Sequence, residues 1–172
     1  MKVLMDNKAI GRALTRISHE IIEKNKGVED IVIIGIKTRG IPLANRIANK
    51  IKLFEEVDVP IGTIDITFYR DDLQKKSLQP VINNPLDFDV EGKTVVLVDD
   101  VIYTGRTCRS AIEAVMNAGR PNKIQFASLI DRGHRELPLT PDYIGKNIPT
   151  SKNEVVRVKL LESDGEDTVQ II

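Results

Sequence analysis

The chain of 172 residues contains no tryptophan, few aromatic residues and a single cysteine, Cys108. One cysteine excludes an intramolecular disulfide and a zinc site built from cysteines, so we expect it to pack on a helix. No apolar run approaches the roughly 20 residues that span a bilayer. The first residues, 1–6, turn polar at once and lack the apolar stretch of a secretory leader. We therefore expect a cytoplasmic protein without a membrane partner.

The chain also lacks an excess of either charge, because Lys+Arg and Asp+Glu both number 25. Any nucleic-acid partner would then need a local basic patch. Apolar residues are 41% and charged residues 29% of the chain, which is typical of a globular domain. The length fits one domain over residues 1–172, without internal repeats or low-complexity segments.

The first predicted helix runs from an N-cap at Asp6 to about Lys26, with Gly27 as its stop. Apolar residues at helical spacing form its inner face: Ile10, Ala13, Leu14, Ile17 and Ile21. The opposite face is mainly basic and carries Lys8, Arg12, Thr15, Arg16 and His19. Such a face is either a solvated helix surface or a stripe that binds phosphates.

The most informative stretch joins an apolar strand, two acids and a short polar loop. It consists of Val95, Val96, Leu97, Val98, Asp99, Asp100, Val101, Ile102, Tyr103, Thr104, Gly105, Arg106 and Thr107. A continuous apolar run indicates a buried parallel strand, and open α/β sheets bind ligands at the carboxyl ends of their strands. The loop at residues 104–107 precedes a helix, and helix N-termini bind anions. Acids beside such a loop suit the hydroxyls and the phosphate of a phosphorylated sugar.

A second strand, 31–36, ends in another basic loop with a glycine: Lys37, Thr38, Arg39 and Gly40. Pro42 then suits the first turn of a helix. The loop is either a plain connection or a second anion site. Because parallel strands share a direction, both loops would lie at one edge of the sheet.

Further along, a strand is expected at 61–68. The apolar residues of the segment 69–93 show no sustained helical or strand spacing. A connection of this length is usually functional or disordered. We interpret it as a mobile flap over the site, shortened by a hairpin between 61–68 and part of 78–82; a plain surface excursion is the alternative.

A helix at 108–118 is expected to turn Ala111, Ile112, Val115 and Met116 inward. Strands follow at 123–130, 155–161 and 168–172.

The thirteen residues 95–107 resemble the signature of type I phosphoribosyltransferases, and no G-x-G-x-x-G or G-x-x-x-x-G-K-[ST] motif occurs. The resemblance implies an α/β fold with a mostly parallel central sheet flanked by helices. It also implies a flexible flap hairpin and a small hood from the N-terminal segment and about 132–155.

Nearly the whole chain resembles one subfamily, the bifunctional pyrimidine operon attenuation proteins and uracil phosphoribosyltransferases. The matching segments are LTRI at 14–17, GIKTRG at 35–40, TFYRDD at 67–72, DRGHRELP at 131–138 and GKNIPTS at 145–151. This resemblance implies conversion of uracil and phosphoribosyl pyrophosphate to UMP. It also implies UMP- or UTP-dependent binding of the pyrimidine operon leader mRNA, which promotes transcription termination, and assembly as homodimers or higher oligomers.

By the same resemblance, residues 104–107 hold the 5′-phosphate, and Asp99 and Asp100 lie near the ribose hydroxyls, where Mg²⁺ would bridge sugar and pyrophosphate. Lys37, Thr38, Arg39 and Gly40 match the pyrophosphate loop, with Arg39 counted among the catalytic residues. Arg70 lies in the flap. Arg132 is a candidate for binding a uracil carbonyl, with a surface salt bridge as the equal alternative.

For RNA, the family helix is matched by Thr15, Arg16 and His19, and a second basic cluster comprises Arg132, His134, Arg135, Lys146 and Lys152. Thr140 stands where an arginine is expected, which weakens one phosphate contact. With aromatics at only 4%, hydrogen bonds and shape must contribute more than stacking. Two alternatives stay open: a phosphoribosyltransferase for another base without an RNA role, and a nucleotide sensor that catalyses poorly.

Overall fold

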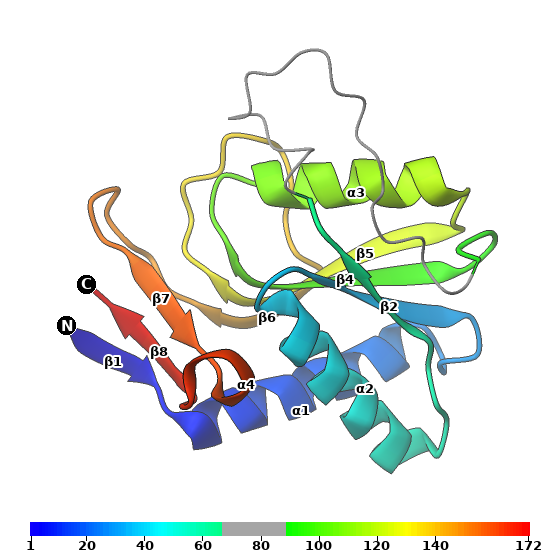
Figure 1. Ribbon diagram of the computed structural model, residues 1–172, viewed down its shortest axis with the longest axis horizontal. Coiled ribbons are helices and arrows are strands. Elements are labelled where there is room, and N and C mark those ends of the chain that lie inside the picture. Colours follow the sequence, from blue (N-terminus) through cyan, green and yellow to red (C-terminus); the bar gives the residue numbers. More distant parts are fainter. Residues whose placement is uncertain (67–88) are drawn as a thin grey trace.

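The computed structural model describes residues 1–66 and 89–172 and contains a five-stranded sheet, a three-stranded sheet and the helices around them (Figure 1). The main sheet and its helices are β2 (Ile31–Ile36), α2 (Gly40–Glu55), β3 (Ile61–Ile64), β4 (Thr94–Ile102), α3 (Arg106–Ala118), β5 (Lys123–Asp131) and β6 (Tyr143–Asn147), together with α1 (Asn7–Lys24). The small sheet contains β1 (Lys2–Met5), β7 (Val156–Lys159) and β8 (Thr168–Ile171), with the short helix α4 (Leu161–Asp164) between the last two.

The strand order of the main sheet is β3-β2-β4-β5-β6, and every neighbouring pair is parallel. The central strands β2 and β4 lie side by side, with Gly35 opposite Val98. The carboxyl ends of both strands therefore meet at one edge of the sheet, as the sequence predicted.

Alternate residues of the central strands pack on opposite faces of the sheet. Ile33, Val96 and Val98 join a core with α1 and α2, whereas Ile34 and Leu97 join a second core with α3. Figure 1 shows α1 and α2 on one side of the sheet and α3 on the other. The continuous apolar runs of β2 and β4 follow from this burial on both faces.

The ends of α1 agree with the prediction. The Asp6 carboxylate accepts a hydrogen bond from the amide of Ala9 at 2.8 Å, so it caps the helix as expected. The cap at the other end is Asn25, and Gly27 follows with φ of +116°. The predicted strand 31–36 is also confirmed by β2.

Two expectations need correction. Met116 is 60% exposed, because the buried side of α3 is centred on Ala111 and Ala114, and Met116 falls nearly opposite. The strand expected at 61–68 ends at Ile64, since Asp65 and Ile66 are outside β3. The rest of that strand, its predicted hairpin partner at 78–82 and Arg70 lie outside the described residues.

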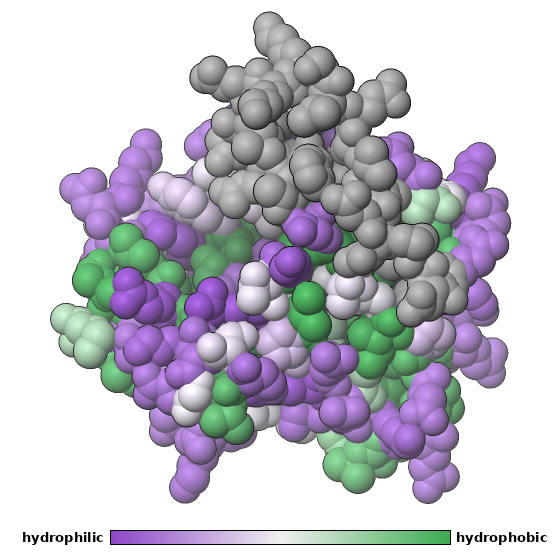
Figure 2. Space-filling model, in the orientation of Figure 1, coloured by the Kyte–Doolittle hydropathy of each residue, from purple (hydrophilic) through white to green (hydrophobic). Residues whose placement is uncertain are grey.

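The small sheet joins the N-terminal segment to residues 156–171, while 132–155 supply β6 and the connections on either side of it. The face in Figure 2 is mainly hydrophilic, with apolar side chains gathered at the left, where β1, β7 and β8 lie, and at the lower right, where α2 ends. Over residues 1–66 and 89–172, no helix is long and apolar enough to cross a membrane.

Gly35 provides a test of the close packing between β2 and α2. A Cβ at Gly35 would lie 2.6 Å from the Gly40 carbonyl oxygen and 2.7 Å from the Ile41 Cα. Gly35→Ala should therefore lower the free energy of unfolding by roughly 1–3 kcal/mol. Gly11→Ala is the control, because nothing lies within 4 Å of its Cβ position; it should raise stability by about 0.5–1 kcal/mol through helix propensity. Urea unfolding measures both, and effects of the same sign would contradict this account.

Candidate active site

Two helix N-termini open at the same edge of the main sheet. α2 begins after β2 and α3 begins after β4, and these strands are neighbours. Within the described ranges neither helix has a side-chain bond from its N-cap residue or an acid in its first turn, whereas Asp6 caps α1. Helix N-termini carry amides without intrahelical acceptors and a partial positive charge. The structure therefore brings residues 37–40 and 104–107 together at one edge, and anion binding by them stays a prediction.

Gly40 brings the first loop directly against the strand that carries the acids. A Cβ at this position would collide with the Val98 carbonyl oxygen and lie 3.3 Å from the Asp99 Cα. The sequence left open whether Gly40 serves close approach or an unusual backbone conformation; the structure shows close approach. The peptide bond between Lys37 and Thr38 in this loop is cis.

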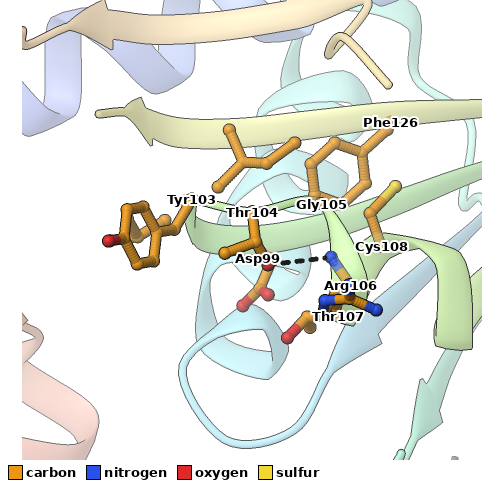
Figure 3. Close-up of a pocket in the computed structure, with 10 residues that line it drawn as sticks. Asp99, Tyr103, Thr104, Gly105, Arg106, Thr107, Cys108 and Phe126 are labelled. Atoms are coloured by element: carbon orange, nitrogen blue, oxygen red, sulfur yellow. Dashed lines mark hydrogen bonds between the residues drawn. The ribbon is translucent and has the colours of Figure 1, made fainter. Parts of the chain in front are cut away.

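The second loop forms the wall of a cavity of about 280 Å³ (Figure 3). Asp99, Val101, Ile102, Tyr103, Thr104, Gly105, Arg106, Thr107, Cys108 and Phe126 line it. Gly105 has φ of +93°, a left-handed conformation that glycine adopts without strain. The Thr104 hydroxyl accepts the amide of Arg106 at 3.2 Å, and the Thr104 carbonyl accepts the amide of Glu136 at 2.8 Å. One hydrogen bond inside the loop and one from the amide of Glu136 thus fix the loop conformation.

Asp99 and Asp100 lie near the carboxyl end of β4, which continues to Ile102. Asp99 is only 7% exposed. Burial raises the pKa of the Asp99 carboxyl well above its usual range, and the charge of Asp100 raises it further. The Asp99 side chain accepts the amide of Asp100, and the Asp100 side chain accepts the amide of Val101, both at 2.8 Å. These bonds fix both carboxyl groups at the end of the strand.

Cys108 lines the same cavity but is not suited to act as a nucleophile. Burial raises the pKa of its thiol to about 12, with the charge of Asp99 as a further cause. The thiol is therefore protonated at neutral pH, and only a thiolate is a strong nucleophile or metal ligand. The expectation that Cys108 packs on the helix after the loop is confirmed.

The basic residues of the first loop have acidic partners. Arg39 donates to both carboxylate oxygens of Asp164, from Nε at 3.2 Å and from Nη2 at 2.9 Å. Lys37 Nζ lies 3.7 Å from Asp65, just beyond β3. Neither acid was singled out from the sequence, because nothing in its local pattern indicates a partner so distant along the chain.

Arg132 is buried beside the loop, with 8% exposure. Its guanidinium lies over the ring of Tyr103, 4.1 Å from the centroid. Nη2 donates to the carbonyls of Ser151 at 3.1 Å and Glu154 at 2.8 Å. Nε is buried and has no hydrogen-bond partner among the residues that the structure describes. A buried, unpaired N–H group is thus left beside Tyr103.

The predicted RNA-binding residues of α1 line one side of a shallow groove. Its walls include Arg12, Thr15, Arg16 and His19, and α2 adds Lys50, which the sequence pattern of one helix could not reveal. The His19 ring stacks on Phe54 of α2, with centroids 4.1 Å apart. Arg16 is partly engaged, because it donates to Glu20 and to the Ile144 carbonyl, each at 3.0 Å.

The second predicted basic cluster is divided. Arg135 uses its three nitrogens within the molecule, donating to Leu139 O at 2.7 Å, Tyr103 O at 2.9 Å and Asp131 at 2.7 Å. Lys152 is exposed, and Lys146 Nζ lies 3.5 Å from the Leu4 carbonyl. The structure therefore gives Arg135 a place in holding the loop, while the lysines stay accessible.

A scan against protein families matches residues 2–163 to the phosphoribosyl transferase domain. The chain belongs to the phosphoribosyltransferase family. Relatives named "Bifunctional protein PyrR" include those of Clostridioides difficile, 62% identical with 98% of this chain and 96% of the relative covered, and of Clostridium novyi, 60% identical with the same coverage. Among solved structures, the hypoxanthine phosphoribosyltransferase of Trypanosoma cruzi superposes with a TM-score of 0.77 at 19% identity, covering 99% of this chain and 95% of that one. This likeness confirms the predicted type I phosphoribosyltransferase fold.

The environment of Asp99 predicts a stability effect with a defined pH dependence. Because its pKa is raised in the folded state, ionising Asp99 at neutral pH costs stability. Asp99→Asn keeps the acceptor for the Asp100 amide and should raise the melting temperature at neutral pH. A gain of about 1 kcal/mol would appear as roughly 2–4 °C.

This gain should shrink as the pH falls and vanish below the ordinary aspartate pKa of about 3.9, where the carboxyl is protonated in both states. Differential scanning calorimetry across this range measures the change, with Glu113→Gln on the exposed side of α3 as the control. A neutral-pH melting temperature lowered by Asp99→Asn would contradict the assignment.

Proposed function

We propose that the chain is a bifunctional protein that makes UMP and regulates a pyrimidine operon. It transfers the phosphoribosyl group of phosphoribosyl pyrophosphate to uracil, and with uridine nucleotide bound it binds leader mRNA and promotes transcription termination. The observation that carries the proposal is the pair of uncapped helix N-termini on either side of Asp99 and Asp100. Phosphoribosyl pyrophosphate has an anionic group at each end and hydroxyls between them. This order matches that of the two helix N-termini and the two acids between them.

The residues then take the following places. The hydroxyls and first-turn amides of 104–107 bind the 5′-phosphate, and residues 37–40 bind the pyrophosphate. A ring nitrogen of uracil forms a bond to the anomeric carbon as the bond to the pyrophosphate oxygen breaks, and the proton of that nitrogen passes to the leaving pyrophosphate or to water. Asp99 and Asp100 hold the ribose hydroxyls while positive charge develops on the sugar. Catalysis is mainly positioning and charge stabilisation.

Magnesium fits this site as part of the substrate complex. Asp99 and Asp100 offer carboxylate oxygens, the ligand type that Mg²⁺ prefers, and Mg²⁺ usually keeps waters and binds through one or two carboxylates plus phosphates. Among residues 1–66 and 89–172, no group of three or more metal-binding side chains occurs. When bound, the ion would neutralise charge on the pyrophosphate, and the two acids would hold it against the ribose.

Arg132 remains our candidate for binding a uracil carbonyl. Its unpaired Nε–H is buried beside Tyr103, and a buried donor without an acceptor is costly unless a ligand supplies one. Arg70 is proposed to act from the flap, where closure would exclude the water that competes with uracil for the activated sugar.

For the RNA, we propose the groove between α1 and α2 as the contact surface, with Thr15, Arg16, His19 and Lys50 on its walls and Lys146 and Lys152 beyond it. A homodimer or higher oligomer would place two such grooves together and enlarge the contact. This role suits a cytoplasmic protein with UMP and UTP as its effectors. Arg135 contributes indirectly, by holding the loop at 131–139.

Steady-state assays with each nucleobase, phosphoribosyl pyrophosphate and Mg²⁺ test the enzymatic half. Uracil should be consumed, and replacing both Asp99 and Asp100 by Asn should lower kcat by at least about 100-fold, because the removed charges act where charge develops. Consumption of hypoxanthine or guanine alone would instead support a purine enzyme. Turnover that survives the double replacement would refute the role of the acids.

Gel-shift titration of a pyrimidine-operon leader hairpin tests the regulatory half. Saturating UMP should tighten binding, and Lys50→Ala should weaken it and reduce the salt dependence by about one unit of slope. Lys123→Ala, at the start of β5 and away from the groove, is the control. If UMP leaves the affinity unchanged, the coupling between the two activities is absent.

A further inference from the structure

We propose that Asp164 is a positioning residue that holds Arg39 in the orientation in which it binds pyrophosphate. The inference rests on the proposed function, because it concerns the loop to which we assign the pyrophosphate. It assigns a task to a segment far from the site in sequence: residues 162–167, between β7 and β8, which we call the acidic turn.

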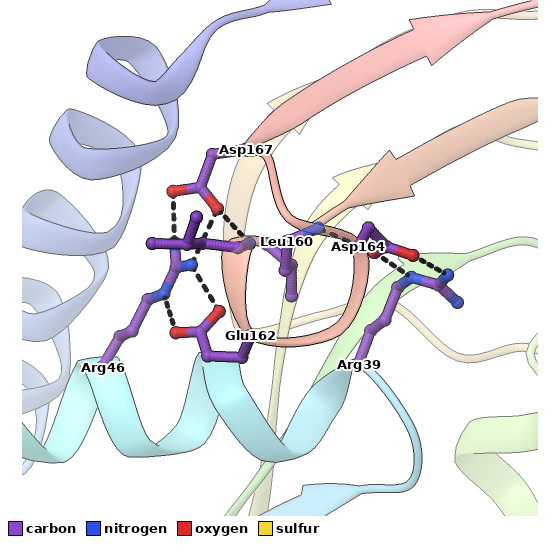
Figure 4. Close-up of polar contacts among 7 residues, drawn as sticks. Arg39, Arg46, Leu160, Glu162, Asp164 and Asp167 are labelled. Carbon is purple, nitrogen blue, oxygen red and sulfur yellow. Dashed lines mark hydrogen bonds and ion pairs between the residues drawn. The ribbon is translucent and has the colours of Figure 1, made fainter.

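The acidic turn is fixed on α2 by a second arginine (Figure 4). Arg46 donates to Glu162 from Nε at 2.9 Å and from Nη2 at 2.6 Å, and to Asp167 from Nη1 at 2.9 Å and Nη2 at 2.8 Å. The Arg46 guanidinium thus binds two carboxylates at once. Since Arg39 and Arg46 are seven residues apart, they lie about two helical turns apart on one side of α2. The turn is therefore held against the start of the helix.

Asp164 is held in place within this turn. One of its oxygens accepts the Leu160 amide at 2.9 Å and also Arg39 Nε at 3.2 Å, while the other accepts Arg39 Nη2 at 2.9 Å. A carboxylate anchored by a backbone amide is a fixed point for the flexible arginine side chain. The paired geometry specifies the plane of the guanidinium as well as its position.

The other edge of the Arg39 guanidinium is not used by Asp164. Nη1 has no hydrogen-bond partner in the part of the chain that the structure describes. The hydrogen bonds that Arg39 donates to Asp164 raise the pKa of Arg39, and the charge of Asp100 contributes in the same direction. Arg39 therefore interacts with the acidic turn by hydrogen bonds and with the charge of Asp100. Holding one edge of the guanidinium leaves the other oriented for an anion, and less side-chain freedom is lost on binding.

Asp164→Asn tests this role, because it keeps the size of the side chain but removes its charge and one acceptor. We expect the dissociation constant for inorganic pyrophosphate with Mg²⁺, measured by titration calorimetry, to rise roughly two- to fivefold, the range of a partly exposed ion pair. The KM for phosphoribosyl pyrophosphate should rise similarly, and kcat should change less. Glu166→Gln is the matched control: it removes the same charge from the same turn, but Glu166 pairs with Lys159 at 2.9 Å. It should leave both constants unchanged.

A double-mutant cycle shows whether Asp164 acts through Arg39. In an Arg39→Ala background, Asp164→Asn should have no further effect on pyrophosphate binding. Tighter binding by Asp164→Asn alone would overturn the proposal, because it would show that Asp164 competes with the ligand. A further loss in the Arg39→Ala background would overturn it as well. Circular dichroism melting curves establish folding, and Asp164→Ser is the second variant if Asp164→Asn does not fold.

The two proposals can fail separately. If the wild-type chain does not consume uracil, the proposed function is wrong, but the pyrophosphate titrations still decide the role of Asp164. If uracil is consumed and Asp164→Asn binds pyrophosphate as the wild type does, only the positioning role is wrong.

Discussion

The close approach of Gly40 to the end of β4 is the contact on which the site depends. Because Gly40 has no Cβ, its backbone can pack directly against the end of β4. A Cβ added at this position would collide with the Val98 carbonyl oxygen and would lie 3.3 Å from the Asp99 Cα. This contact places the start of α2 beside the two acids, and β4 itself leads into the start of α3. The two helix ends that we propose as anion sites and a carboxylate pair are thus joined by backbone packing, which tolerates little adjustment.

The electrostatics of this edge follow from the packing. The chain has no net charge, so the site cannot depend on an overall basic field and needs local arrangements. Uncapped helix ends supply positive potential without side-chain charges. The acidic turn forms ion pairs with Arg39 and Arg46, so these two cations are held in fixed positions. The groove that we propose for RNA likewise combines residues of two helices, α1 and α2.

Much of this arrangement could be predicted from the sequence where the signal is local. The apolar runs of β2 and β4, the N-cap at Asp6 and the two loops all have short-range patterns, and the structure confirms the first two features. The orientation of Met116 was wrong, because helical spacing alone did not fix which arc of α3 is buried. Asp164 and Lys50 were missed, since their partners come from distant segments. The hydrogen bonds that Arg135 makes within the molecule could not be predicted either, because a sequence shows a charged residue but not its partners.

A crystal structure with phosphoribosyl pyrophosphate and Mg²⁺ bound tests the central claim most directly. We predict the 5-phosphate at the amides and hydroxyls of 104–107, the pyrophosphate at residues 37–40 with Arg39 in contact, and the ribose hydroxyls at Asp99 and Asp100. A ligand bound with its pyrophosphate away from residues 37–40, or with its ribose out of reach of both acids, would contradict the account.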